Sequence, residues 1–262
     1  MLRLLYLTTS ARSMTDDAWL FPDWPAPRAV HAAVTTRQGP GVSAAPFDRF
    51  NLGLRSGDSS DAVSANRSAL REVLGLPAAP RWLHQVHGTV VAELGPLPSE
   101  QEPQADAAVS RLPGTVLAIL TADCLPVLFC SGDGRQIGAA HAGWKGLAAG
   151  VLEATVEQMQ IAPQRVLAWI GPCVGKASYE IDAPVREAFV SGDAAAEAYF
   201  EATRPGHWLC DMAGLARHRL SRAGVEQIYD GGIDTRADER FYSYRRDGAK
   251  SGRFASLIWL GN

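Results

Sequence analysis

The sequence predicts an α+β fold built from layers of sheets and helices. Short apolar segments of β type and amphipathic segments of helical type are interspersed along the 262 residues, but they do not alternate as regular βαβ units. Neither a GxGxxG sequence nor a P-loop sequence is present, so the fingerprints of the common nucleotide-binding folds are missing. A mixed, layered arrangement is therefore favoured over one doubly wound parallel sheet.

The first half of the chain is expected to supply strands around one helix. Residues 28–37 predict a strand that leads into a Gly- and Pro-rich turn. Residues 59–76 predict a helix, because apolar side chains recur at helical spacing and Pro77 follows. Residues 81–94 predict two strands joined by a turn at Gly88.

The middle of the chain is expected to supply three short strands and a second helix. Residues 115–120 and 125–130 are apolar β-type runs on either side of the sequence TADC. Residues 135–143 predict another strand, and residues 145–160 predict the helix that follows it.

The last third of the chain should close the fold. Residues 166–175 predict a buried strand that leads into a Gly/Pro loop. Residues 211–224 predict a helix with Asp211 as its N-cap and Gly224 at its end. Residues 240–260 predict two closing strands around a glycine-containing loop.

The beginning of the chain differs from the rest. Its apolar stretch is too short for a secretory signal, so we expect residues 1–18 to form a disordered extension, with Met14 as an alternative start. Residues 19–262 are expected to form the domain. No apolar run in the sequence approaches the length needed to span a bilayer.

Charge and cysteine content restrict the partners and the compartment. The net charge of −3 and the sequence pI of about 6.1 give no general attraction to nucleic acid or to an anionic membrane. The four cysteines are widely spaced and form no CxxC pair, so a reducing cytoplasm is expected. A monomer is the default expectation.

Two histidines and one cysteine stand out by their local sequence. His87 precedes a glycine in QVHG, Cys124 lies in ADCLP at an expected strand end, and His141 lies in the small-residue stretch GAAHAGWKG. Two imidazoles and a thiolate suit Zn²⁺, and three protein ligands leave a fourth position for water, as in catalytic zinc sites. The alternative is three packed, hydrogen-bonded side chains, because their separations match no short-range metal motif.

Eight ordered segments, from about residue 20 to the end of the chain, resemble the laccase-domain family. This family is also called the YfiH or "polyphenol oxidase" family, and is assigned purine nucleoside phosphorylase activity. The segments are TTRQGPGVS, FNLGLRSGD, NRSAL, HQVHG, TADCLPVLF, AAHAGWKG, IGPCVG followed by YEID, and FYSYRRDG followed by GRFASLIWL. Two departures are Pro40, where the family usually has a second glycine, and GGIDTRADER, which lacks a Cys-Thr pair. Both concern loop shape rather than the three ligand positions.

The resemblance implies a single-domain mixed β-sandwich flanked by helices, with zinc held by His87, Cys124 and His141. It implies phosphorolysis of adenosine, inosine and guanosine, release of the base from methylthioadenosine, and hydrolytic deamination of adenosine. A true multicopper oxidase is excluded, because its blue site and copper cluster need roughly ten histidines and this chain has six, with no HxH pair. Copper in the same pocket is possible, with polyphenol oxidation as a side activity.

The two reactions ask for different groups around the metal. Deamination needs an activated water and a carboxylate that moves protons. Asp123 is the candidate, which makes His87, Cys124 and Asp123 the predicted catalytic group; the alternative is that Asp123 only orients the ligands. Phosphorolysis needs cations for phosphate.

The local sequence offers four candidate cations: Arg55, Arg67, Lys145 and Arg245. Arg67 could equally form an ordinary salt bridge on its helix, and Lys145 could equally lie in solvent. Trp144 could wall the pocket or simply pack. Glycines 143 and 146 would let the backbone turn tightly over the metal.

Two other functions use the same groups. Some bacterial members of the family act as a peptidoglycan editing factor that removes an L-Ser wrongly incorporated after muramic acid, which the same zinc pocket would serve. A metal-dependent binding module without catalysis is the third possibility, although the complete ligand trio argues against it.

Overall fold

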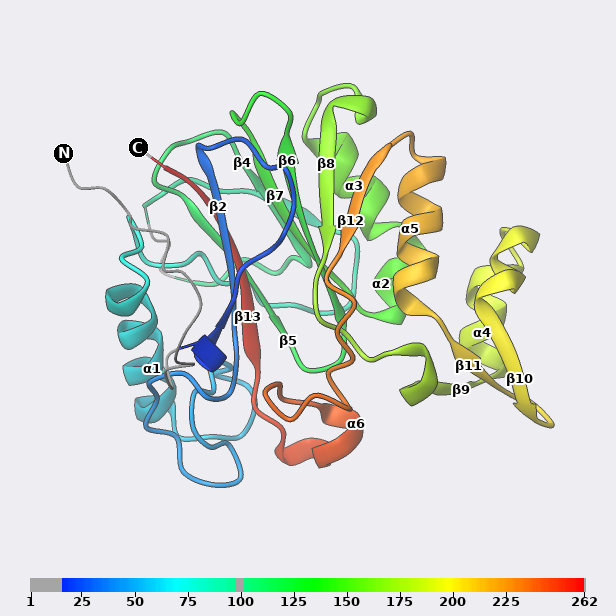
Figure 1. Cartoon of the computed structure of the whole chain (residues 1–262), viewed down its shortest axis with the longest axis horizontal. Helices are drawn as coiled ribbons and strands as arrows, with labels where there is room; N and C mark the ends of the chain where they lie inside the picture. The colour runs from blue at the N-terminus through cyan, green and yellow to red at the C-terminus, as the bar shows by residue number, and fades with distance from the viewer. Residues whose placement is uncertain (1–15, 98–100, 262) are drawn as a thin grey trace.

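A computed structural model describes residues 16–97 and 101–261, and its core is a sandwich of two large sheets (Figure 1). The first sheet is antiparallel throughout. Its strand order is β1 (Trp19–Leu20), β2 (Val30–Thr35), β13 (Phe254–Leu260) and β5 (Val116–Thr121).

The second large sheet is mixed, because its two outermost pairs are parallel and its inner pairs are antiparallel. Its order is β12 (Gln227–Asp230), β8 (Val166–Ile170), β6 (Leu125–Ser131), β7 (Ile137–Ala142), β4 (Ala107–Ser110) and β3 (Val91–Glu93). A smaller sheet has the order β10 (Phe200–Arg204), β11 (His207–Cys210), β9 (Glu180–Asp182).

Helices cover the outer faces of the sandwich and connect its strands. The α-helices are α1 (Ser60–Val73), α2 (Trp144–Ala149), α3 (Val151–Gln158), α4 (Ala183–Val190), α5 (Met212–Arg222) and α6 (Tyr244–Asp247). Short 3₁₀ turns are η1 (Asp16–Ala18), η2 (Pro163–Arg165), η3 (Lys176–Ser178), η4 (Ala194–Tyr199) and η5 (Gly248–Lys250). None of the helices in the described ranges has both the length and the apolar character needed to cross a membrane.

Three apolar clusters join the two large sheets to each other and to the helices on their outer faces. Between the two large sheets, Ile258 of β13 packs in one cluster with Leu128 of β6 and Trp169 of β8. Leu70 of α1 belongs to a cluster on the outer face of the first sheet. The opposite outer face, on the second sheet, packs against α3 and α5, for example through Leu215. Figure 1 shows α1 on one side of the sandwich and α3 and α5 on the other.

Both faces of each large sheet are covered. The central strands are therefore almost wholly apolar and do not alternate between apolar and polar residues. This is the single-domain α+β sandwich with flanking helices that the sequence comparison implied, and the fold prediction is confirmed. The small sheet and α4, beside α5 in Figure 1, were not anticipated.

Two element predictions were wrong in detail. Only β3 forms within residues 81–94, because the segment before it makes isolated β-bridges, at Arg81 and His84, instead of a continuous strand ladder. Residues 240–260 form one closing strand instead of two. The first half of that segment is drawn into the short helix α6, where the Ser243 hydroxyl caps the helix by accepting from the Arg246 N–H.

Of the expected N-terminal extension, residues 1–18, residues 1–15 lie outside the described part of the chain. Its last three residues form η1. The Ala18 carbonyl accepts from the Thr36 N–H at 3.0 Å, and the Asp17 carbonyl accepts from the Thr36 hydroxyl at 2.7 Å. The described part of the fold therefore starts slightly before residue 19.

The helix predicted over residues 145–160 is divided into α2 and α3 at Gly150, whose φ is +101°. We expect Gly150→Ala to lower the free energy of unfolding by about 1–2 kcal/mol, because an L-residue is strained at positive φ. Denaturant titration measures this loss. Gly192→Ala is the control and should change stability little, because that glycine is exposed, lies outside the positive-φ region and has open space where a Cβ would stand.

Candidate active site

Three side chains from separate parts of the chain meet at one end of the second sheet. Antiparallel pairing of β6 with β7 places Pro126 opposite His141, so Cys124, just before β6, lies beside the end of β7. His87 reaches the same place from the loop that precedes β3. The ligand atoms of His87, Cys124 and His141 all lie within 4.8 Å of one another, and Cys124 Sγ is 3.7 Å from His87 Nε2.

The donor set and its spacing fit a metal ion. Zinc–sulfur and zinc–nitrogen bonds of usual length put a sulfur and a nitrogen about 3.5 Å apart in a tetrahedral site. The 3.7 Å between Cys124 and His87 is close to that value. His87 is exposed while His141 is buried, so one side of the cluster is open to the solvent. The three residues can therefore hold a metal and leave a position for another ligand.

A buried carboxylate that sequence reasoning missed organises the cluster. Asp106 Oδ1 accepts from His141 Nδ1 at 2.8 Å, which leaves His141 Nε2 to face the metal position. The same carboxylate accepts from the backbone N–H groups of His87 at 2.8 Å and Gly88 at 2.7 Å, and from that of Val86. Asp106 thus positions two of the three ligands at once. Although burial opposes its ionisation, the hydrogen bonds from His141 and the backbone keep the Asp106 pKa low.

The backbone around the cluster is held in unusual conformations. His87 and Asp123 have φ values of +62° and +87°, which residues other than glycine seldom adopt. A Cβ at Gly143 would lie 2.5 Å from His87 Cδ2, and one at Gly146 would lie 2.8 Å from the Gly88 carbonyl. The two glycines therefore let the end of β7 and the start of α2 approach the His87 loop, as expected from the sequence.

The thiol of Cys124 has a lowered pKa, which favours the thiolate form that binds metals. Burial raises the pKa of its thiol, but the adjacent imidazoles of His141 and His87 outweigh this and lower the pKa to about 6. The other cysteines are buried, and burial raises the pKa of Cys130 and of Cys210 to about 12. All four are free thiols.

The low pKa of Cys124, compared with the raised pKa of Cys130 and Cys210, predicts selective alkylation of Cys124. We expect iodoacetamide to modify Cys124 in the metal-free protein at pH 7, where about 90% of a thiol with a pKa near 6 is thiolate, and to spare the buried cysteines. Because the reactive form is the thiolate, the rate should fall about tenfold between pH 7 and pH 5. Peptide mass spectrometry measures the modified sites. Equal labelling of Cys124 and Cys130 would contradict the pKa difference.

The cluster lies in the wall of a cavity of about 620 Å³, a volume suited to a small organic ligand. Apolar and aromatic side chains form much of the remaining lining. These are Leu54, Leu83, Val86, Leu120, Ala122, Trp144, Val174, Tyr179, Met212 and Tyr244. Trp144 does both of the things considered for it, because it lines the cavity and also packs against the apolar cluster beneath α2.

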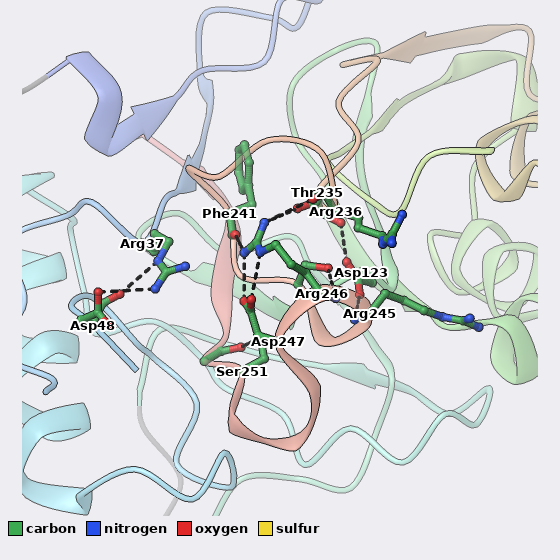
Figure 2. Close-up of polar contacts among 12 residues, drawn as sticks. Arg37, Asp48, Asp123, Thr235, Arg236, Phe241, Arg245, Arg246, Asp247 and Ser251 are labelled. Atoms are coloured by element: carbon green, nitrogen blue, oxygen red, sulfur yellow. Dashed lines mark hydrogen bonds and ion pairs between the residues drawn. The ribbon is translucent and has the colours of Figure 1, made fainter. Parts of the chain in front are cut away.

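Asp123 lines the cavity, but both of its carboxylate oxygens already accept hydrogen bonds from the protein. Oδ1 accepts from the Thr235 hydroxyl at 2.6 Å, and Oδ2 accepts from the Arg245 N–H at 2.6 Å. Figure 2 shows Asp123 between these two partners, with the Arg246–Asp247 ion pair beside them. The carboxylate therefore ties Thr235 and the first turn of α6 to the segment just before β6, which favours an orienting role.

The four cations selected from the sequence do not all reach the cavity. Arg55, Lys145 and Arg245 are among its lining residues, and Arg67 is not. Arg67 donates to Glu102 at 2.9 Å and stacks over the Trp82 ring at 4.1 Å, the structural role that was its alternative. Arg55 also pairs with Glu102, at 2.6 Å.

Lys145 and Arg245 are exposed at the cavity wall. Lys145 Nζ lies 5.6 Å from the Trp144 ring centre, and Arg245 lies over Tyr179 at 4.5 Å. Arg253, a further cavity residue, was not selected from the sequence. It stands in SGRFAS, immediately before β13, and nothing in that local pattern distinguishes it from an ordinary surface arginine.

The fold and the cluster define the class of protein: a layered α+β protein with three potential metal ligands in the wall of one cavity. The chain belongs to the family described as multi-copper polyphenol oxidoreductase laccase, whose family model matches residues 31–261. The family resemblance seen in the sequence is thereby confirmed.

Named relatives and a solved structure agree with this assignment. The chain is 52% identical over 252 residues to a purine nucleoside phosphorylase of Xylella fastidiosa, covering 92% of this chain and 96% of the relative. It is 48% identical over 242 residues to the purine nucleoside phosphorylase YfiH of Escherichia coli, covering 92% and 98%. A crystal structure of a Neisseria meningitidis protein superposes with a TM-score of 0.88 at 42% identity, covering 94% of this chain and all of that one.

Proposed function

We propose that this protein is a zinc-dependent purine nucleoside phosphorylase that also deaminates adenosine. The observation that carries the proposal is one cavity that brings the His87–Cys124–His141 cluster together with several cationic side chains. The names of the relatives supply the substrate class. Adenosine, inosine, guanosine and methylthioadenosine are the proposed substrates.

In phosphorolysis a phosphate oxygen forms a bond to C1′ of the ribose while the bond from C1′ to N9 breaks. The base leaves with the electron pair and takes up a proton. The residues of this chain would bind both reactants: cations such as Lys145 and Arg245 would hold the phosphate, and Trp144 and Tyr244 offer ring faces for the base. The apolar lining would limit water and so favour transfer to phosphate.

Zinc suits the two imidazoles and the thiolate, and Cu²⁺ would bind the same set. When bound, zinc supplies Lewis acidity and a water of lowered pKa, as hydrolytic deamination requires. Asp106 fixes His141, and Asp123 holds the start of β6 through Thr235 and Arg245, so both carboxylates would orient the ligands. We assign Asp123 this positioning role, because each of its oxygens already accepts a hydrogen bond from the protein.

A chromatographic assay with and without phosphate tests the proposal. Protein of known zinc content is offered inosine or adenosine, and hypoxanthine, inosine and ribose-1-phosphate are followed. Release of hypoxanthine that requires phosphate and forms equal ribose-1-phosphate supports phosphorolysis, and conversion of adenosine to inosine without phosphate supports deamination. If neither nucleoside reacts while about one zinc per chain remains bound, the purine assignment is wrong, and hydrolysis of an L-Ser-containing muramic acid precursor becomes the reaction to assay.

A further inference from the structure

Arg253 differs from the other cations of the cavity in how it is held. It is half-buried, whereas Arg55, Lys145 and Arg245 are exposed. Like Lys145 and Arg245, it has no carboxylate ion-pair partner among the described residues, whereas Arg55 is paired with Glu102. Its charge is therefore left for a ligand.

Backbone atoms fix the direction of its guanidinium. Nη1 donates to the carbonyl of Ser251 at 2.7 Å and to that of Gly252 at 2.8 Å, which uses both of its hydrogens. For Nε and Nη2 the described residues provide no hydrogen-bond partner. The free Nε–Nη2 edge has two parallel N–H groups, the geometry with which arginine binds phosphate or carboxylate through two hydrogen bonds.

The loop from Asn51 to Gly53 holds the rest of the residue. Asn51 Oδ1 accepts from the backbone N–H groups of Arg253 at 2.8 Å and of Gly53 at 3.0 Å, and the Leu52 N–H donates to the Arg253 carbonyl at 3.0 Å. A Cβ at Gly53 would lie only 2.6 Å from Arg253 Cγ, so the loop packs directly on the arginine stem. A side chain held in this way loses little conformational freedom when it binds an anion.

Arg253 also lies near the ligand cluster. Burial lowers the pKa of its guanidinium, and the charges of Cys124 and Asp123 act in the opposite direction. All three residues line the same cavity. An anion on Arg253 would thus be held in the cavity whose wall carries the metal ligands.

We propose that the Nε–Nη2 edge of Arg253 is the phosphate-binding fork of this cavity, with Lys145 and Arg245 as secondary contacts from the exposed wall. The identity of the anion as inorganic phosphate rests on the proposed phosphorylase function. The fork itself rests on the contacts of Arg253.

Direct binding of inorganic phosphate tests this without turnover. Calorimetric titration is done on zinc-replete protein, alone and with a C-nucleoside whose glycosidic bond cannot be cleaved. Arg253→Lys keeps the charge and loses the fork, and we expect it to weaken phosphate binding at least about tenfold. Arg253→Gln should weaken binding further. Arg240→Gln, which removes an arginine paired with Asp238 outside the cavity lining, should bind phosphate like the parent.

Each outcome bears on the proposal. Phosphate binding of unchanged strength in Arg253→Lys and Arg253→Gln would overturn it, and phosphorolysis persisting in these variants would leave the proposed function intact. Absence of phosphate binding to the parent protein under both conditions would also overturn it, and the turnover assay then decides separately on the phosphorylase function. If Arg253→Gln does not fold, as judged by its thermal transition, Arg253→Lys alone decides.

Discussion

Cys124→Ala is expected to lose its bound metal and about a thousandfold or more in nucleoside phosphorolysis, which is the largest effect we expect from any single change. The sulfur is one of three donor atoms gathered within 4.8 Å, and its pKa near 6 makes it an anionic ligand at neutral pH. A catalytic metal contributes several kcal/mol of transition-state stabilisation, and about 4 kcal/mol corresponds to a thousandfold in rate.

Cys130→Ala is the matched control. Cys130 lies six positions further along, in β6, is fully buried in the core between the sheets, and has a thiol pKa raised to about 12 by that burial. Removing its sulfur should cost about 1–2 kcal/mol of stability and leave metal content and turnover unchanged. Metal analysis by mass spectrometry and the phosphate-dependent assay give the two readouts. Stoichiometric metal and full activity in Cys124→Ala would show that the cluster is not the catalytic centre.

Much of the fold follows from local patterns that the sequence displays. The stripe of Val63 and Leu70 and the following Pro77 predict α1, and Asp211 is the N-cap of α5, accepting from the Gly214 N–H at 2.8 Å. The short helix α6 could not be predicted in this way. Its first turn is held by the distant Asp123 carboxylate, which accepts from the Arg245 N–H.

In the candidate site, too, local sequence identifies some residues, while contacts between distant parts of the chain decide where they lie. His87, Cys124 and His141 were selected as potential ligands by local context and by family resemblance, but only the pairing of β6 with β7 and the path of the His87 loop bring them together. Asp106 escaped notice because it stands among alanines in ADAAVS, where a carboxylate resembles an exposed loop residue. Its burial beside His141 arises from the β4–β7 pairing, which no local signal encodes.

Substitution of Asp106 is therefore expected to have the second large effect. Its carboxylate both orients His141 and holds the loop that contains His87. We expect Asp106→Asn to lower metal affinity about 10- to 100-fold, since the amide no longer fixes the Nδ1 hydrogen of His141 as an anionic acceptor does. We also expect a loss of about 3 kcal/mol in the free energy of unfolding. The amide NH₂ replaces one of two oxygens that accept from the Val86, His87 and Gly88 N–H groups, so at least one of these partly buried donors faces an NH₂ group instead of an acceptor.

Chelator competition measures the metal affinity, and denaturant titration of the metal-free protein measures the stability. Asp133→Asn is the control, because that carboxylate also accepts a backbone N–H but lies 41% exposed in a surface turn, so it should change neither quantity appreciably. The double variant Asp106→Asn/Cys124→Ala separates the two roles. Since Cys124→Ala already removes the metal, the stability loss from Asp106→Asn should persist in that background if the carboxylate holds the His87 loop by itself. A stability loss that appears only in the metal-loaded protein would show instead that Asp106 acts solely through the metal, and that the loop reaches its position only when the ion is bound.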